Sequence, residues 1–289
     1  MAMDELRREP PGTRSEQQPD GQAGSQLPLW PSEPAPATSP SRPVSSPTSG
    51  MEPPWSLADL GAFVSFALLS FLFVVLAASL FLPSGEETSR QTPFMISMQV
   101  GLEFSWLLFI YFIITTKYRR PFWQALRWVR GPQHGVNYLL GGAALAFLAP
   151  ILDWTFDQFN LFPSEQPLPI EKWLSSPDAA YLLVVLGICV APFVEELIFR
   201  GFFYPVFERL WGFWMAVLLT AVLFAAIHAP QLWGGWPEIA TILVVGGVFS
   251  YCRGKTGSLL PPFLMHLAYN SCLFVSMYIS TDGFRNLGG

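Results

Sequence analysis

Long apolar runs, broken by short polar segments, dominate the chain from Leu57 onward. A helix needs about 20 predominantly apolar residues to cross a hydrocarbon core of about 30 Å. Seven runs approach that length: 57–82, 93–116, 135–156, 181–209, 213–231, 238–253 and 258–280. The sixth is short for a full crossing. The pattern contains no strand alternation and no internal repeat. It therefore predicts an all-α fold, a multi-pass transmembrane helical bundle of about seven spans (six to eight).

The stretch 1–55 follows a different pattern. It holds 12 of the 27 prolines, with many Ser, Gly and Gln and almost no apolar periodicity. Such a stretch cannot bury enough apolar surface to offset its ordering entropy. We expect a disordered Pro/Ser-rich tail over 1–55 and a transmembrane helical domain over 56–289. A cleavable signal peptide is not expected, because positions 1–30 contain no apolar core.

Lysine and arginine are concentrated in two of the loops between these runs. The loop at 117–130 carries five of them, and Arg253 and Lys255 lie between the sixth and seventh runs. Because cytoplasmic loops carry the excess of basic residues, these loops and the N-terminus are predicted to be cytoplasmic, with the protein in the cell membrane. Within the first of these loops, 121–131 alternates aromatic and basic residues and predicts an interfacial amphipathic helix.

Composition agrees with a membrane protein and excludes several other classes. Hydrophobic residues make up 51% of the chain and charged residues 13%, against about 25% charged in soluble domains. The formal net charge is −5, so no electrostatic footprint for a nucleic acid is present and no nucleic-acid partner is expected. Cys189, Cys252 and Cys272 are far apart and have neither a disulfide pattern nor metal-ligand spacing.

The informative residues are those that interrupt the apolar runs. Glu195, Glu196 and Arg200 lie in the fourth run, and His228 lies near the end of the fifth. The seventh run carries a further pair, His266 and Asn270. An ionised side chain at the centre of a bilayer costs about 2.5–3.5 kcal/mol on insertion scales. These groups must therefore pair, neutralise or face a wet cavity.

Spacing along the helix predicts how the fourth run divides its charges. Glu196 and Arg200 are four residues apart with the acid first, which is the favourable order for an ion pair on one helical face. Glu195 is rotated by about 100° from Glu196 and has no local cation of its own. We interpret the pair as fixing the helix, and Glu195 as a candidate general base.

The predicted depths of these groups in the membrane coincide. Counted at about 1.5 Å per residue from the cytoplasmic helix ends, Glu195, His228 and Asn270 lie at about 20, 22 and 21 Å, and His266 at about 15 Å. Three helices would then deliver their polar groups to one level. Pro192, just before the acids, is expected to kink the fourth span and open space for water.

Three motifs in order, each on an apolar helix, resemble a known family. They are Glu-Glu-x-x-x-Arg at 195–200, Phe-x-x-x-His at 224–228 and His-x-x-x-Asn at 266–270. The resemblance is to the CAAX protease and bacteriocin-processing family of intramembrane endopeptidases, which includes the type II CAAX prenyl endopeptidases. It covers about residues 179–280, the expected catalytic core.

This resemblance implies a glutamate-type hydrolysis of peptide bonds. Glu195 and His228 would activate a water, His266 and Asn270 would donate hydrogen bonds to the oxyanion, and Glu196 with Arg200 would support them. No cofactor is favoured. The expected partners are a peptide or protein substrate at the membrane and the lipid bilayer. Some relatives process prenylated C-terminal peptides.

Two alternatives stay open. Glu195, His228 and His266 could ligate a catalytic zinc with a water in the fourth position, although no His-Glu-x-x-His motif is present. The protein could also be a non-hydrolytic scaffold, an immunity protein or a proton-coupled transporter. The polar groups lie in the C-terminal half, whereas transporters commonly show repeat symmetry, which disfavours transport.

Three further residues are interpreted separately. Phe224 is expected to pack beneath His228, and His134 is expected to be a solvated loop residue. Glu103, a carboxyl group in the second run, is left without an assigned role.

Overall fold

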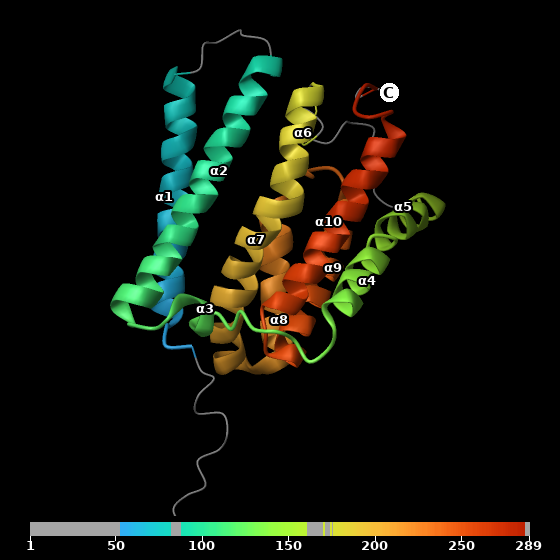
Figure 1. The fold of residues 1–289 in the computed structure, drawn as a ribbon. Helices are drawn as coiled ribbons and strands as arrows, with labels where there is room; N and C mark the ends of the chain where they lie inside the picture. Colours follow the sequence, from blue (N-terminus) through green and yellow to red (C-terminus); the bar gives the residue numbers. More distant parts are fainter. Residues whose placement is uncertain (1–52, 82–87, 161–169, 171–173, 175, 287–289) are drawn as a thin grey trace, which may run out of the picture. The chain divides into compact units, whose positions relative to one another are not determined.

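A computed structural model describes residues 53–81, 88–160, 170, 174 and 176–286, and every regular element in that part of the chain is a helix. The all-α fold class is therefore confirmed (Figure 1). The α-helices are α1 (Leu57–Phe81), α2 (Thr88–Phe112), α3 (Phe122–Ala125), α4 (Gly135–Leu145), α5 (Leu148–Gln158), α6 (Pro177–Val185), α7 (Ala191–Glu196), α8 (Tyr204–His228), α9 (Trp236–Thr256) and α10 (Leu260–Ser280). Three wider, π-helical segments connect some of them: η2 (Ile113–Lys117), η4 (Leu186–Val190) and η5 (Leu197–Phe203).

Within the described residues, five helical segments are long and apolar enough to cross a membrane, which makes the chain a multi-pass membrane protein. They are Leu57–Leu80, Phe94–Lys117, Gly135–Gln158, Pro177–His228 and Leu260–Ser280. The fourth of these contains the fourth predicted run and all but the last three residues of the fifth. The sixth predicted run forms helix α9, whose ends carry charged residues and which is not among the five.

Gly212 divides the long fourth segment where the sequence predicted a boundary between two runs. Its backbone has φ 81° and ψ 172°, which is not helical and which only glycine adopts readily. The second part of α8 packs back along η5, since the rings of Phe199 and Phe224 meet edge to face with 5.4 Å between their centroids. This reversal brings His228 to the level of α7.

The burial pattern is the inverse of that of a soluble protein. Large apolar side chains such as Phe73 and Leu80 are 72% exposed, whereas Glu196 and Arg200 are fully buried. Apolar side chains on the outside match hydrocarbon, and charged groups in a membrane bundle face its interior. The bundle is thus held by interior packing and polar contacts while its outer face is suited to lipid.

The last residue of the predicted tail packs within the bundle. Trp55 is fully buried, its Nε1 donates to the carbonyl of Phe202 at 2.8 Å, and its ring stacks on Phe202 at 5.3 Å. Arg209 donates to the carbonyl oxygen of Trp55 at 2.8 Å. Trp55 therefore anchors the start of the helical domain, and positions 1–52 of the tail predicted over 1–55 lie outside the described residues.

The basic loop after η2 is mostly non-helical. Helix α3 covers only Phe122–Ala125, and Arg127 has a φ of 60°, which ends the helix. The predicted interfacial helix over 121–131 is therefore wrong, because one left-handed residue interrupts the aromatic and basic pattern. In Figure 1 this loop runs along one end of the bundle, the end at which α2 finishes and α10 begins.

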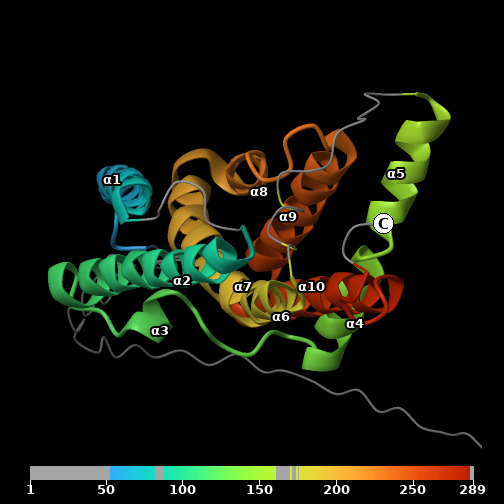
Figure 2. The same cartoon turned by 90° about the horizontal axis from the view of Figure 1, so that it is seen from above.

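Helices α2, α7 and α10 form one side of the bundle. Figure 2 shows them in a row, with α8 and α9 behind, and contacts join α7 to both neighbours. Helix α8 packs mainly on α9, and α10 packs mainly on α4. This arrangement surrounds α7, which carries the paired glutamates, with the helices that carry the two histidines.

Candidate active site

Glu195, at the end of α7, lies between two histidine side chains. Its Oε1 is 3.7 Å from Nε2 of His228 on α8, and its Oε2 is 3.7 Å from Nε2 of His266 on α10. The three side chains are 18%, 15% and 5% exposed, so they form a secluded cluster. The structure thus brings together three of the four residues predicted to meet at one depth.

His228 has a fixed orientation. Its Nδ1 lies 2.7 Å from the carbonyl oxygen of Phe224, one turn earlier on α8, and the two rings are 4.7 Å apart. A carbonyl only accepts, so Nδ1 carries the proton and Nε2 of the neutral ring is an acceptor. Phe224 packs beneath His228, as predicted. The acceptor nitrogen of His228 and the carboxylate of Glu195 therefore face each other.

His266 is held by a carboxylate instead. Its Nδ1 lies 3.0 Å from Oε1 of Glu196, and its ring packs against Phe249 at 4.9 Å. Such a carboxylate fixes both the orientation of an imidazole and the position of its proton. Glu196 therefore positions the histidine that faces Glu195, a contact between two helices that the spacing of the motifs did not predict.

The predicted ion pair of Glu196 and Arg200 is present, with Nη1 and Oε1 2.9 Å apart and both side chains fully buried. Arg200 also donates to the hydroxyl of Ser250 at 3.2 Å and to the carbonyl of Gly246 at 2.8 Å. Its guanidinium lies 4.4 Å from the centre of the Phe224 ring. A buried ion pair is stable only when its remaining donors are satisfied, which α9 achieves here.

Asn270 contacts a different part of the site. Its Nδ2 donates to the carbonyl of Gly187 in η4 at 2.7 Å. In a π-helix a carbonyl accepts from the residue five positions later, and here that residue is Pro192, which has no N–H. The Gly187 carbonyl therefore has no backbone donor, and Asn270 supplies one. The amide ties α10 to η4 one turn beyond His266.

The same arrangement occurs in η5. The carbonyl of Arg200 would pair with residue 205, which is also a proline, and it accepts from Nε of Arg253 at 3.0 Å instead. Sequence analysis missed Gly187, Ser250, Gly246 and Arg253. A proline inside a long apolar helix signals a carbonyl in need of a donor, but only the fold identifies the side chain that provides it.

The donor set of the cluster is chemically suited to zinc, since it contains a carboxylate and two imidazoles, and each imidazole is oriented by a further partner. Among the described residues, however, no group of three or more His, Cys, Asp or Glu side chains is placed closely enough to hold a metal ion. Glu195, His228 and His266 would be the ligands if a zinc bound, and it would supply an acidified water.

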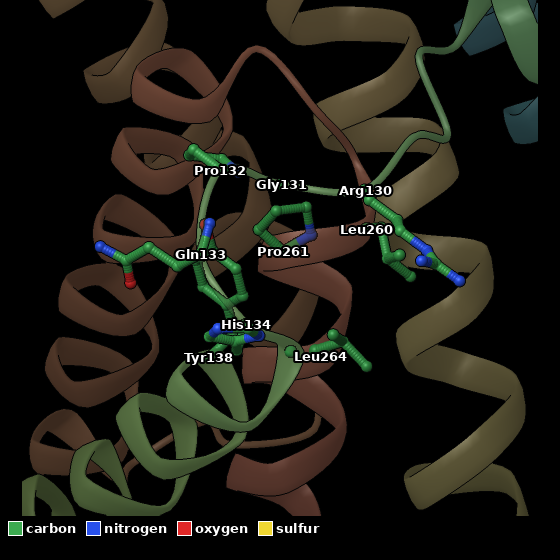
Figure 3. A pocket seen from close by; sticks show the side chains of 10 residues that line it. Arg130, Gly131, Pro132, Gln133, His134, Tyr138, Leu260, Pro261 and Leu264 are labelled. Carbon is green, nitrogen blue, oxygen red and sulfur yellow. The ribbon is translucent and has the colours of Figure 1, made fainter.

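Two hollows lined by described residues lie outside the cluster. One of about 440 Å³ is lined by the loop before α4 and the start of α10. In Figure 3 its Arg130 and Gln133 side chains point to opposite sides of the loop, and Tyr138 and Pro261 form the wall. His134 is an exposed residue of this loop, as predicted. A second, apolar hollow of about 420 Å³ lies between α5, α8 and α9.

One protein-family model matches the part of the chain that contains the cluster. Residues 177–272 match the family model described as Rce1-like, type II CAAX prenyl endopeptidase. The match contains Glu195, His228, His266 and Asn270, together with the supporting pair of Glu196 and Arg200. The resemblance inferred from the three motifs is therefore confirmed over this third of the chain, and α1 to α5 lie outside it.

Three curated proteins are similar to parts of the chain. An Escherichia coli protein named "Uncharacterized 24.3 kDa protein" is 31% identical over 46% of this chain and 60% of its own length. The "UPF0177 protein YbdI" of Lactococcus lactis subsp. lactis is 26% identical over 33% of this chain and 49% of its own. The "Putative membrane peptidase YdiL" of Bacillus subtilis is 24% identical over 34% of this chain and 38% of its own.

The matched part of the chain thus spans between 38% and 60% of the length of these relatives. No solved structure matches the chain. The family model and the Bacillus subtilis relative both support a function of the membrane-peptidase type.

Proposed function

We propose that the protein is an intramembrane endopeptidase that hydrolyses peptide bonds of membrane-associated substrates. The observation that carries this proposal is the convergence of Glu195, His228 and His266, with gaps of 3.7 Å between the carboxylate and each imidazole. Such a gap is too long for a direct hydrogen bond but suits groups that share a third partner. A water or a substrate oxygen fits that description.

Glu195 and His228 would act on the water. Both present acceptors, so a water between them donates one hydrogen to the carboxylate and one to Nε2 of His228. Its lone pair then faces the substrate carbonyl. Glu195 takes a proton as the oxygen attacks, and this proton passes to the leaving nitrogen when the C–N bond breaks. The products are a carboxylic acid, which keeps the second hydrogen of the water until it ionises, and an amine.

His266 and Asn270 would stabilise the oxyanion. Glu196 accepts from Nδ1 of His266, so Nε2 can donate to an oxyanion only when the ring is an imidazolium. A charged donor stabilises a developing oxyanion more strongly than a neutral one. One N–H of Asn270 is used by Gly187, and the second one is the donor assigned to the oxyanion.

The metal-free reaction is our preferred version, and zinc at Glu195, His228 and His266 is the alternative. The two differ in one measurable property. Dialysis of the purified protein against a chelator leaves turnover unchanged in the first case and abolishes it in the second, with recovery on addition of zinc.

A non-hydrolytic scaffold, immunity or transport role is the second candidate function, since buried ionisable groups in membranes also serve partner binding and ion passage. Comparison of peptide termini in cells that express the wild type or Glu195→Gln distinguishes the two. An endopeptidase generates termini that vanish in the variant, with Glu208→Gln as the matched control. Identical termini in both strains would rule the protease out in those cells.

We also propose that the protein lies in the cell membrane with the basic end of the bundle in the cytoplasm. Lys117, Lys255 and Arg130 are at this end, and the described residues just before α1 reach it as well. The positive-inside rule is the basis of this orientation.

A further inference from the structure

Glu103 is a buried carboxyl group on α2, outside the part of the chain that matches the family model. It is only 7% exposed. Its Oε1 accepts from Nε2 of Gln99 at 3.0 Å, and its Oε2 has no hydrogen-bond partner among the described residues. A buried polar atom without a hydrogen-bond partner costs free energy. Near a functional site, such an atom indicates that a bound molecule supplies the partner.

The neighbours of Glu103 on the same face of α2 fix the direction in which it points. Ile96, two turns earlier, packs with Leu183 and Leu186 of the α6–η4 region. Ile110, two turns later, belongs to the core cluster that contains Val194 of α7. Residues seven apart share a helical face. Helix α2 contacts α6, α7 and η5. Glu103 therefore faces the α6–α7 side of the bundle, between the levels of Ile96 and Ile110.

Its depth matches that of Glu195. Lys117, at the end of η2, pairs with Asp59 near the start of α1. Arg209 of α8 donates to the carbonyl of Trp55, four residues before Asp59. Lys117 and Arg209 are therefore both anchored at the level where α1 begins. The stretch from Glu103 to Lys117 is as long as the stretch from Glu195 to Arg209. Each stretch includes one π-helical segment, so the two carboxyls lie at a similar distance from that level, at most about 21 Å at the α-helical rise per residue. The two are also close enough for their charges to interact.

Given the proposed endopeptidase function, on which this inference rests, we propose that Glu103 binds the nitrogen side of the scissile bond. Its free Oε2 accepts a hydrogen bond from the amide N–H of the substrate peptide. When the C–N bond breaks, the proton held by Glu195 passes to that nitrogen, and the leaving amine stays paired with Glu103. The substrate then lies between α2 and α7, with water attacking from the His228 side.

An amide and an ester probe separate this role from a structural one. The protein is reconstituted in liposomes and given a farnesylated Cys-aliphatic-aliphatic-X peptide, or its depsipeptide analogue with an ester at the scissile position. The ester has no N–H to donate. In Glu103→Leu we expect kcat/KM for the amide to fall about tenfold or more, and kcat/KM for the ester to change by less than about twofold.

Two further variants accompany this one. Glu103→Gln keeps an acceptor and the contact with Gln99, so the amide-to-ester ratio should lie between those of the wild type and Glu103→Leu. Ser105→Ala removes a hydroxyl that bonds within α2, to Leu102, and should leave both rates unchanged.

The outcomes are distinguishable. Equal losses on both probes, or no loss on either, would overturn the role of Glu103 while leaving the endopeptidase intact. Failure of the wild type to cleave either probe would overturn the proposed hydrolysis of this substrate class together with the inference.

Discussion

The two histidines of the cluster differ in the group that accepts the hydrogen bond from Nδ1. A backbone carbonyl holds His228 and a carboxylate holds His266. With a carbonyl at Nδ1, the neutral ring of His228 has an acceptor at Nε2, whereas an imidazolium at His266 would have a donor there. Identical residue types can therefore serve opposite purposes on either side of Glu195, one toward the water and one toward the oxyanion.

Glu196 and Arg200 are expected to contribute to stability only together. Each variant alone, Glu196→Gln or Arg200→Met, leaves its partner buried without an opposite charge, which costs about 3–5 kcal/mol of stability. The double variant should lose clearly less than the sum of the two, as seen by thermal unfolding in detergent micelles. Additive losses would mean that the two side chains do not depend on each other.

At the scale of elements, proline and the π-helical turn act together. Pro192 and Pro205 each leave a carbonyl five positions earlier without a backbone donor, and side chains of α10 and α9 fill the two positions. Helices distant in sequence are thereby tied to the one that carries Glu195. The kink predicted at Pro192 takes the form of a widened turn that accepts a side chain from another helix.

Pro192→Ala should weaken this tie. The alanine N–H competes with Asn270 for the carbonyl of Gly187, so Asn270 is less well positioned and turnover of a farnesylated peptide falls about tenfold. Replacing Asn270 by Ala should then cost less in the Pro192→Ala background than in the wild type. Pro177→Ala, at the start of α6, is the matched control. An undiminished effect of the Asn270 variant in both backgrounds would contradict this account.

At the scale of the whole molecule, the sequence predicted the helical class, the segments and the meeting of three site residues. Apolar run length determines helices in lipid, and helix rise converts residue number to depth. The sequence could not predict the contact of Glu196 with His266 or the role of Gly246 as an acceptor, because both depend on which helices are neighbours in the fold. The interfacial helix failed on Arg127, whose backbone is left-handed and whose carbonyl accepts from the N–H of Leu259.

Orientation in the membrane is also a property of the whole molecule. Lys255→Cys lies at the basic end of α9 and Ser280→Cys at the opposite end of α10, and both positions are exposed. In intact cells a membrane-impermeant maleimide should label Ser280→Cys at once and Lys255→Cys only after permeabilisation. The unchanged chain measures labelling of the three native cysteines. The reverse pattern would place the basic end outside.

Hydrolysis in H₂¹⁸O by the purified, reconstituted protein tests the joint action of Glu195 with its two histidines most directly. With a farnesylated Cys-aliphatic-aliphatic-X peptide, the wild type should release a product carboxylate that carries one ¹⁸O atom. Glu195→Gln, with the same shape but no base, should lower the rate by about a hundredfold or more. Equal release of labelled product by the wild type and by Glu195→Gln would contradict the account.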